Sequence, residues 1–291
     1  MSIVQFVHLG GFQMIDKRKG MVLITLVLTI ILFACGKNEE KSGTTNGNAA
    51  TISISGSTSV GPLAEKLAEK YKEKNNVNIE INQIGSSAGI TNAVNGVSEI
   101  GMSSRDLKEE EKASLQETVI AYDGIVVVTH PSNHVKNLTI AQVKDIFTGK
   151  ITNWKEVGGD DLEIVVVSRE DGSGSRDAFQ EIVGYSSGEL VRNSIIASGN
   201  GNIKTTVATN KHAVGFISFE YIDESINTVS INGVEATAEN VLRQKYSLSR
   251  PFLFVHKEEN LSDEGKKFID FILSSEGQKI VRETGAIPVK M

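Results

Sequence analysis

One stretch in the second half of the chain combines the residue types that bind oxyanions. VVSREDGSGSRDAF, residues 166–179, places Arg169 before a loop of Gly and Ser that leads into a helical pattern. The first backbone N–H groups of a helix lack partners inside the helix, and the macrodipole adds partial positive charge there. Arginine contributes a planar fork of donors that matches an oxyanion. The candidate anion ligands of this stretch are Arg169, Ser173, Gly174 and Ser175.

Three other turns of small residues also stand directly before helical patterns. They are SGSTSVGP (55–62), GSSAGI (85–90) and SGNGNIKT (198–205). For any one turn, ordinary capping is the simpler interpretation, because Ser, Thr and Gly are favoured at helix starts. Four such turns in one chain, one of them beside Arg169, favour helix N-termini that converge on an anion. The candidate ligands come from the first two of these turns and are Ser57, Thr58, Ser59, Ser86 and Ser87.

The tetrapeptide Ser103-Ser104-Arg105-Asp106 follows a strand-like pattern and offers a second cation for such a site. Ser104 and Arg105 are therefore candidate ligands as well. The competing interpretation for Arg105 is a surface salt bridge with Asp106 or Glu109, because exposed pairs of this kind are often incidental. The sequence leaves both interpretations open.

An enzymatic interpretation of these motifs needs more residues than the sequence clearly supplies. Residues 85–89 match G-x-S-x-G, the pattern of a nucleophile elbow, with Ser87 as the nucleophile. The histidine of a triad would be His212 or His256, and neither occupies a distinctive loop. No spacing of His, Cys and Asp suggests a metal site. We therefore predict a protein that is not an enzyme and needs no metal or cofactor, with a secreted esterase as the alternative.

The N-terminal region has the pattern of a bacterial lipoprotein signal. A basic segment, residues 16–20, precedes the apolar residues 21–34, a run shorter than the ~20 residues of a membrane span. The run ends at Cys35, the single cysteine, in a context that resembles a lipobox. We predict a signal peptide over residues 1–34 and a lipidated Cys35 as the mature N-terminus. The alternative is a buried helix with an ordinary core cysteine.

The segment that follows is polar and rich in Gly and Asn. Residues 35–50 are therefore predicted to be the lipidated cysteine and a flexible tether. The sequence leaves open whether translation begins at Met1 or at Met14.

Beyond residue 50, strand patterns alternate with helical patterns. Strands are predicted at 51–55, 77–84, 125–128, 164–167, 214–217 and 252–255. Helices are predicted around Leu63, Leu67 and Tyr71 and at 87–96, 107–116, 139–147, 175–184, 202–209 and 262–284. The alternation predicts an α/β protein with mostly parallel sheets.

Size and charge narrow the function classes. The chain of 291 residues is long enough for two domains with their own cores. Its net charge of −6, with no basic run beyond the N-terminus, argues against nucleic-acid binding. An anion would therefore have to be bound by local groups, against the overall charge.

The motifs, taken in order, resemble one family. SGSTSVGP, IGSSAGI and EIGMSSRDL are followed by IFTGKITNWKEVGG (146–159), SREDGSGSRDAF, AVGFIS and YSLSRPF. In this combination residues 51–291 resemble the phosphate-binding lipoproteins of bacterial Pst-type ABC importers.

This resemblance implies a type II periplasmic-binding-protein-like fold, with two α/β lobes joined by a hinge of crossing strands. By analogy, lobe one would comprise residues 51–128 plus 249–291, and lobe two residues 129–248. The ligand would be inorganic phosphate and the partner the transmembrane subunits of an ABC permease. The protein would be a monomer on the outer side of the cell membrane, held there by its lipid anchor. The ligand roles would fall on Thr58, Ser59, Ser86, Arg169, Ser173, Gly174 and Ser175.

One position departs from the family pattern. Well-known members have an aspartate where this chain has Ser104, and that carboxylate accepts a hydrogen bond from the protonated oxygen of hydrogen phosphate. Here Asp106 or Asp171 would have to supply the acceptor, or selectivity against sulfate rests elsewhere. A receptor for sulfate, molybdate or another tetrahedral oxyanion is therefore an alternative. An adhesin or signalling protein on the same scaffold is another.

Overall fold

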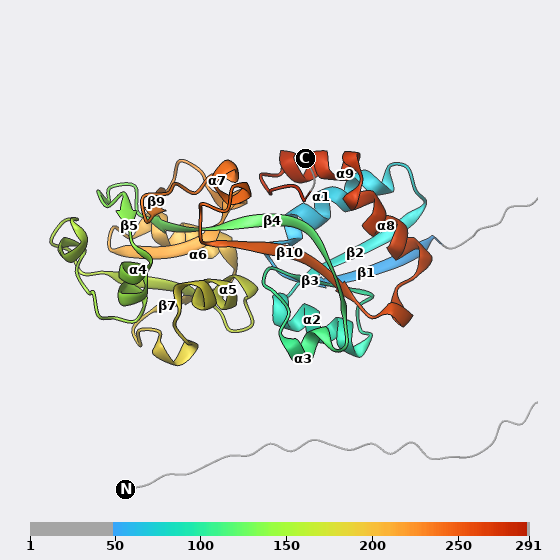
Figure 1. Ribbon diagram of the computed structural model, residues 1–291, viewed down its shortest axis with the longest axis horizontal. Helices are drawn as coiled ribbons and strands as arrows, with labels where there is room; N and C mark the ends of the chain where they lie inside the picture. The colour runs from blue at the N-terminus through green and yellow to red at the C-terminus, as the bar shows by residue number, and fades with distance from the viewer. Residues whose placement is uncertain (1–48, 290–291) are drawn as a thin grey trace, which may run out of the picture. The chain divides into compact units, whose positions relative to one another are not determined.

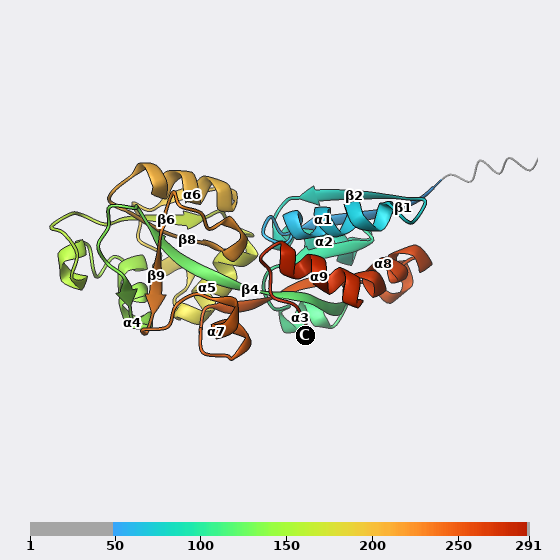
Figure 2. The same ribbon diagram turned by 90° about the horizontal axis from the view of Figure 1, so that it is seen from above.

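The computed structural model describes residues 49–289. Over much of this range the chain alternates between strands and helices (Figures 1 and 2). This alternation confirms the predicted α/β class. The strands are β1 (Ala50–Gly56), β2 (Val77–Gln83), β3 (Ile100–Ser103), β4 (Gln116–Thr129), β5 (Asn137–Leu138), β6 (Val165–Arg169), β7 (Ile195–Ala197), β8 (Ala213–Ser218), β9 (Asn227–Ile231) and β10 (Ser249–His256). The α-helices are α1 (Gly61–Lys72), α2 (Ser86–Asn95), α3 (Glu109–Lys112), α4 (Ile140–Phe147), α5 (Gly174–Val183), α6 (Gly199–Thr209), α7 (Ala238–Leu242), α8 (Asp263–Leu273) and α9 (Ser275–Glu283). Short 3-10 helices are η1 (Trp154–Val157), η2 (Ser187–Glu189), η3 (Phe219–Tyr221) and η4 (Glu258–Asn260).

The strands form one mixed sheet in the order β2-β1-β3-β10-β4-β8-β6-β7, with β9 beside β4 and β5 beside β9. At one end β1 runs parallel to β2 and β3, and at the other end β6 runs parallel to β7 and β8. The middle is antiparallel, because β10 pairs with β3 and β4, and β4 pairs with β8. Two parallel βα systems are thus joined by antiparallel strands.

The strands β4 and β10 run between the two ends (Figures 1 and 2). The first part of β4, from Gln116 to Gly124, pairs with β10, and the second part, from Ile125 to Thr129, pairs with β8. One continuous strand therefore belongs to both ends of the sheet. This arrangement confirms the predicted hinge of crossing strands.

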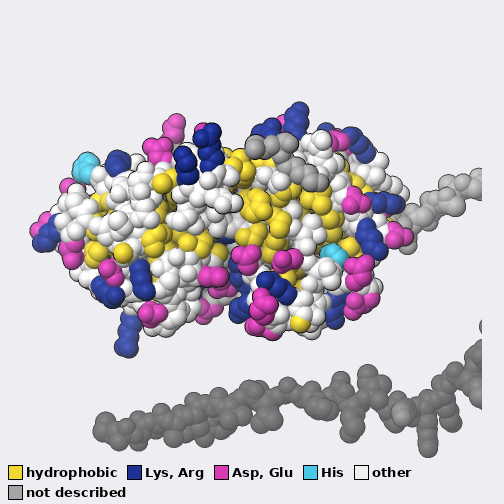
Figure 3. Space-filling view, in the orientation of Figure 1, with side chains coloured by type: hydrophobic (Ala, Val, Ile, Leu, Met, Phe, Trp, Pro, Cys, Tyr) yellow, Lys and Arg dark blue, Asp and Glu magenta, His cyan; other side chains and the backbone are white. Residues whose placement is uncertain are grey.

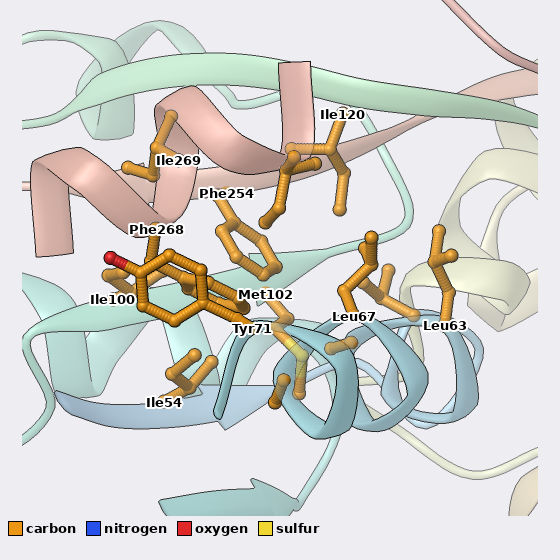
Figure 4. Close-up of a cluster of buried hydrophobic side chains, with 14 of the residues drawn as sticks. Ile54, Leu63, Leu67, Tyr71, Ile100, Met102, Ile120, Phe254, Phe268 and Ile269 are labelled. Carbon is orange, nitrogen blue, oxygen red and sulfur yellow. The ribbon is translucent and has the colours of Figure 1, made fainter. Parts of the chain in front are cut away.

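The first hydrophobic core covers the β1–β3 end of the sheet (Figure 4). Leu63, Leu67 and Tyr71 recur every four residues along α1, and all three side chains are buried there. The ring of Tyr71 lies 5.2 Å from that of Phe268 on α8, measured between centroids. Burying a side chain of this size stabilises the fold by about 1.5–3 kcal/mol.

A second hydrophobic core covers the β6–β8 end. It contains Phe147 of α4, Trp154 of η1, Phe179 of α5 and Phe216 of β8. The rings of Phe179 and Phe216 stack with centroids 4.1 Å apart. Each end of the sheet thus has its own core, and β4 and β10 link the two, which is the two-lobed architecture that the sequence predicts.

Several predicted boundaries are wrong for local reasons. The single helix predicted over 262–284 is two helices, α8 and α9, because Ser274 is extended and its hydroxyl caps α9 by accepting from the Gly277 N–H. The helix predicted over 107–116 is only the four residues of α3, since the chain leaves it to enter β4. The strand-like pattern before Ser103 corresponds to β3, but the sequence patterns did not predict β5, β7, β9 and α7.

The predicted signal peptide, the lipidated Cys35 and most of the tether lie outside the described residues. Within residues 49–289, none of the helices has both the length and the apolar character that a membrane crossing requires.

Candidate functional site

The four turns predicted from the sequence lie at the N-termini of α1, α2, α5 and α6, and hydrogen bonds connect all four. The hydroxyl of Ser59, before α1, lies 2.9 Å from the hydroxyl of Ser175 on α5. The side-chain amide of Asn200 on α6 donates to the same Ser59 hydroxyl at 2.9 Å. Because α1 and α6 belong to opposite ends of the sheet, these helix starts converge from both ends.

The start of α2 approaches the α5 turn in the same way. The Ser87 backbone N–H donates to the carbonyl of Gly172 at 3.2 Å. The residue that precedes α2, Gly85, has φ of 93°, a conformation that favours glycine. A Cβ on Gly85 would lie only 3.1 Å from the Gly172 carbonyl oxygen. The close approach therefore depends on glycine at this position.

Two buried serines face the first residue of α5. The hydroxyls of Ser86 and Ser104 lie 3.3 Å apart, and the Ser104 N–H donates to the Ser86 hydroxyl at 3.1 Å. A Cβ on Gly174 would collide with the Ser86 hydroxyl and would lie 2.8 Å from that of Ser104. The backbone at the start of α5 can approach these hydroxyls because Gly174 has no side chain.

Arg169 lies at the end of β6, and its side chain is 1 % exposed. Its Nε and Nη2 groups each donate to the Glu170 carboxylate at 2.8 Å. Nη2 also donates to the Thr58 hydroxyl at 2.9 Å, and Nη1 donates to the Asn200 side-chain oxygen at 3.4 Å. Burial acts to raise the pKa of Glu170, but the hydrogen bonds and charge of Arg169 outweigh it and leave this pKa below its ordinary value. The guanidinium is thus held in place beside the Ser and Thr hydroxyls.

The predicted surface salt bridge of Arg105 is wrong in its partners and in its exposure. The side chain is 4 % exposed and donates through Nη1 and Nη2 to the Glu111 carboxylate at 2.7 and 2.8 Å. Nε donates to Asp177 at 3.1 Å, and Nη1 also donates to the backbone carbonyl of Asp106. Protein acceptors therefore take four of the five guanidinium N–H groups.

The structure gives Ser57 a local role and places the Ser87 backbone against the α5 turn. The hydroxyl of Ser57 accepts the backbone N–H groups of Ser59 and Val60, which holds the turn before α1. The hydrogen bonds of Ser87 involve neither His212 nor His256, the histidines considered as its partners. His212 Nδ1 pairs with the Glu163 carbonyl. His256 is the last residue of β10, opposite Gln116, and lies at the other end of that strand from Ser249.

Neither aspartate considered as the proton acceptor provides a buried carboxylate. The Asp171 side chain is 93 % exposed and pairs with Arg176. Asp106 is exposed as well. The structure therefore leaves the other possibility, that selectivity against sulfate rests on groups other than these two aspartates.

A buried ion pair joins the crossing strands, and the sequence patterns did not predict it. Asp123 of β4 and Arg250 of β10 are paired in register, and the guanidinium donates to Asp123 at 2.8 and 3.0 Å. Arg250 also donates to the Ser104 carbonyl at 3.2 Å, so the pair reaches the site. The quoted motif YSLSRPF contains Arg250, but nothing in the local pattern indicates Asp123.

Asn200 and Glu170 were also missed, although both contact Arg169. Asn200 lies in the predicted turn at 198–205. Its position in a turn before a helix was the sequence signal that could have identified it as a site residue. Glu220 on η3 is a further titratable group close to the hinge. Burial and then the charge of Asp123 raise its pKa to about 9.

The chain is similar to known phosphate-binding proteins over nearly its whole length. A family model described as the PBP superfamily domain matches residues 41–276. The phosphate-binding protein PstS of Borreliella burgdorferi is 32% identical over 285 residues, which cover 94% of this chain and 99% of that protein. PstS of Bacillus subtilis is also 32% identical, with 94% and 95% covered.

Solved structures agree with this similarity. One is from Clostridium perfringens, is named as a phosphate ABC transporter substrate-binding protein with bound phosphate, and is 64% identical with a TM-score of 0.81. The match covers 82% of this chain and 100% of that one. An ABC-type phosphate transport receptor from Vibrio cholerae is 38% identical with a TM-score of 0.72, and 81% and 99% of the two chains are covered.

Proposed function

Because the chain belongs to the PBP superfamily and, within it, to the PstS family of phosphate-binding proteins, we propose that it captures inorganic phosphate outside the cytoplasm and delivers it to an ABC permease. The observation that carries this proposal is the convergence of helix N-termini from both ends of the sheet. Contacts between Ser59, Ser175 and Asn200 support it directly. Phosphate would be bound among these groups, between the two lobes.

The residues proposed to hold phosphate supply two kinds of donor. The starts of α1, α2 and α5 provide backbone N–H groups and partial positive charge. The side chains proposed as ligands are Thr58, Ser59, Ser86, Ser104, Arg169 and Ser175. A hydroxyl can donate to one ligand oxygen or accept from a protonated one. Serines can therefore serve both the mono- and the diprotonated form of phosphate.

Balanced charge is a feature of the proposed site. The buried guanidinium groups of Arg169 and Arg250 are each paired with a carboxylate, that of Glu170 or Asp123. The protein therefore does not rely on a surplus of buried cations to attract the ligand. No bond of the ligand is made or broken in such binding, so we propose a receptor and not an enzyme.

Calorimetric titration of the purified, ligand-stripped protein with phosphate tests the proposal. Binding of one phosphate per chain, tight enough to persist in an excess of sulfate, is the expected result. An absence of binding heat with phosphate at several temperatures would overturn the proposal and favour testing ester hydrolysis by Ser87 instead.

One observation favours a second candidate, a receptor with broader oxyanion selectivity. Ser104 stands in the site, whereas Asp106 and Asp171 are exposed. A carboxylate with free lone pairs would repel fully deprotonated sulfate, and hydroxyls would not. Competition of sulfate and molybdate for bound phosphate at pH 7 separates the two candidates.

We extend the proposal to the domain boundaries and the membrane anchor. The first core draws its residues from 52–121 and 252–286, which supports lobe one as 51–128 plus 249–291. The second core lies almost wholly within 125–248, which supports lobe two, proposed as 129–248, and would add residues 125–128 to it. We propose that lipidated Cys35 tethers a monomer to the membrane. Mass spectrometry of the protein from membranes would detect the lipid and its attachment point.

A further inference from the structure

We propose that Arg105 and Asp177 form a latch that holds the two halves of the phosphate site at binding distance. This inference rests on the proposed function, because it concerns how the same site closes. The latch is the hydrogen-bonded ion pair between Arg105 Nε and the Asp177 carboxylate, 3.1 Å apart.

The arginine side of the latch is built into the β3 end of the molecule. Arg105 directly follows Ser104, whose hydroxyl faces Ser86. Both oxygens of the Glu111 carboxylate on α3 accept from the guanidinium. Glu111 also accepts the Lys108 backbone N–H, so the carboxylate is itself held. The guanidinium is thereby fixed relative to the Ser104 side of the site.

The aspartate side belongs to the opposite end of the molecule. Asp177 lies in the first turn of α5, three residues after Gly174 and two after Ser175. Its backbone N–H donates to the Ser173 carbonyl, which ties it to the loop before the helix. A bond from Arg105 to Asp177 therefore fixes the start of α5 against the Ser86 and Ser104 hydroxyls.

The geometry assigns this pair to closure and not to ligand contact. Four of the five guanidinium N–H groups of Arg105 have protein acceptors, and three of these bonds go to the carboxylates of Glu111 and Asp177. Arg169 has as many bonds, but two of them go to the neutral side chains of Thr58 and Asn200. Asp177 is an anion, so it would repel phosphate and cannot donate to it. Its side chain is 34 % exposed, which leaves it free to separate from Arg105 when the lobes open. In Figure 3, acidic and basic side chains gather at the place where Figure 1 draws α3.

The chain supplies a matched control. Asp171 and Asp177 both pair with an arginine at the α5 end, but the partner of Asp171 is Arg176, on α5 itself. Asp171→Asn and Asp177→Asn therefore make the same change of charge near the same helix. Only Asp177→Asn removes an ion pair that connects the two ends of the sheet.

The test compares phosphate dissociation rates of the wild type and the two variants by stopped flow. We expect Asp177→Asn to raise the dissociation rate about fivefold or more, because a charge-assisted hydrogen bond of the closed form is weakened. Asp171→Asn should stay within about twofold of the wild type, and Asp177→Glu should recover part of the loss. Equal rates for Asp177→Asn and Asp171→Asn would overturn the latch.

A second measurement does not depend on phosphate binding. Small-angle scattering of the ligand-free proteins should give a larger radius of gyration for Asp177→Asn than for the wild type and Asp171→Asn. An unchanged radius together with unchanged rates would contradict the latch. A wild type that does not bind phosphate would overturn the proposed function, and the scattering comparison alone would then decide whether the pair holds the lobes together.

Discussion

Arg105 and Arg169 have similar local sequences but contact different groups. Each is the middle residue of a Ser-Arg-acidic tripeptide at the end of a strand, β3 or β6. Arg169 pairs with its neighbour Glu170 and reaches the Thr58 hydroxyl of the other end of the molecule. Arg105 instead pairs with the carboxylates of Glu111 and Asp177, which lie farther along the chain than its neighbour Asp106.

The difference shows that the facing element, and not the tripeptide, decides the role of the arginine. Arg169 pairs with one carboxylate, that of Glu170, and its other bonds go to the neutral side chains of Thr58 and Asn200, which can turn to a ligand. Arg105 faces Glu111 and Asp177, so its charge is already compensated twice. A guanidinium with two carboxylate partners has little attraction left for a third anion.

The largest expected effect comes from Arg169→Ala. Removing the guanidinium should weaken phosphate binding about 100-fold, because a charge-assisted donor in a buried site is lost. Calorimetry gives the affinity, and circular dichroism confirms that the variant is folded. An affinity within a few-fold of the wild type would show that Arg169 has no contact with the ligand.

Thr58→Val should have the next largest effect. Valine keeps the shape of threonine but removes the hydroxyl that accepts from Arg169 Nη2. We expect about tenfold weaker phosphate binding, since one hydrogen bond and the orientation of the guanidinium are lost. Thr209→Val, at the exposed end of α6, is the control and should bind like the wild type.

Arg105→Ala should weaken binding less, by about fivefold, through faster dissociation and with little change in the association rate. The reason is that this side chain stabilises the closed form without touching phosphate. Stopped-flow measurements separate the two rates. A loss as large as that of Arg169→Ala would remove the contrast between the two arginines.

Glu220→Gln should affect stability more than binding. The pKa of Glu220 is raised to about 9, so the folded protein keeps this carboxyl protonated while the unfolded chain ionises it above its ordinary pKa of 4.5. Ionisation in the unfolded state therefore lowers the free energy of unfolding as the pH rises from about 4.5 to 9. The variant removes this contribution.

Thermal unfolding at pH 5 and pH 8 measures this effect. Relative to the wild type, Glu220→Gln should gain at least about 2 °C in Tm on going from pH 5 to pH 8. The same difference between the two proteins at both pH values would mean that Glu220 is ionised in the fold.

The turns that begin helices could be predicted from the sequence because their chemistry is local. Gly and Ser residues directly before a helical pattern, such as those before Leu63 and after Arg169, usually begin a helix. The turns at 55–62 and 171–177 lie where they were expected. The repeat of Leu63, Leu67 and Tyr71 likewise identified a buried helix face, since that spacing follows the helical period.

Partners that meet through the register of distant strands could not be predicted. Asp123 finds Arg250 only because β4 and β10 pair antiparallel over that particular register. Arg105 finds Asp177 only when the two ends of the sheet come together. Such contacts carry no local sequence signal.

A crystal structure of the protein grown with phosphate tests the central claim most directly. The account predicts one phosphate among the starts of α1, α2 and α5, in contact with Arg169 and the Ser and Thr hydroxyls, while Arg105 stays bonded to Asp177. Phosphate bound to Arg105, with Arg169 turned away from it, would contradict the account.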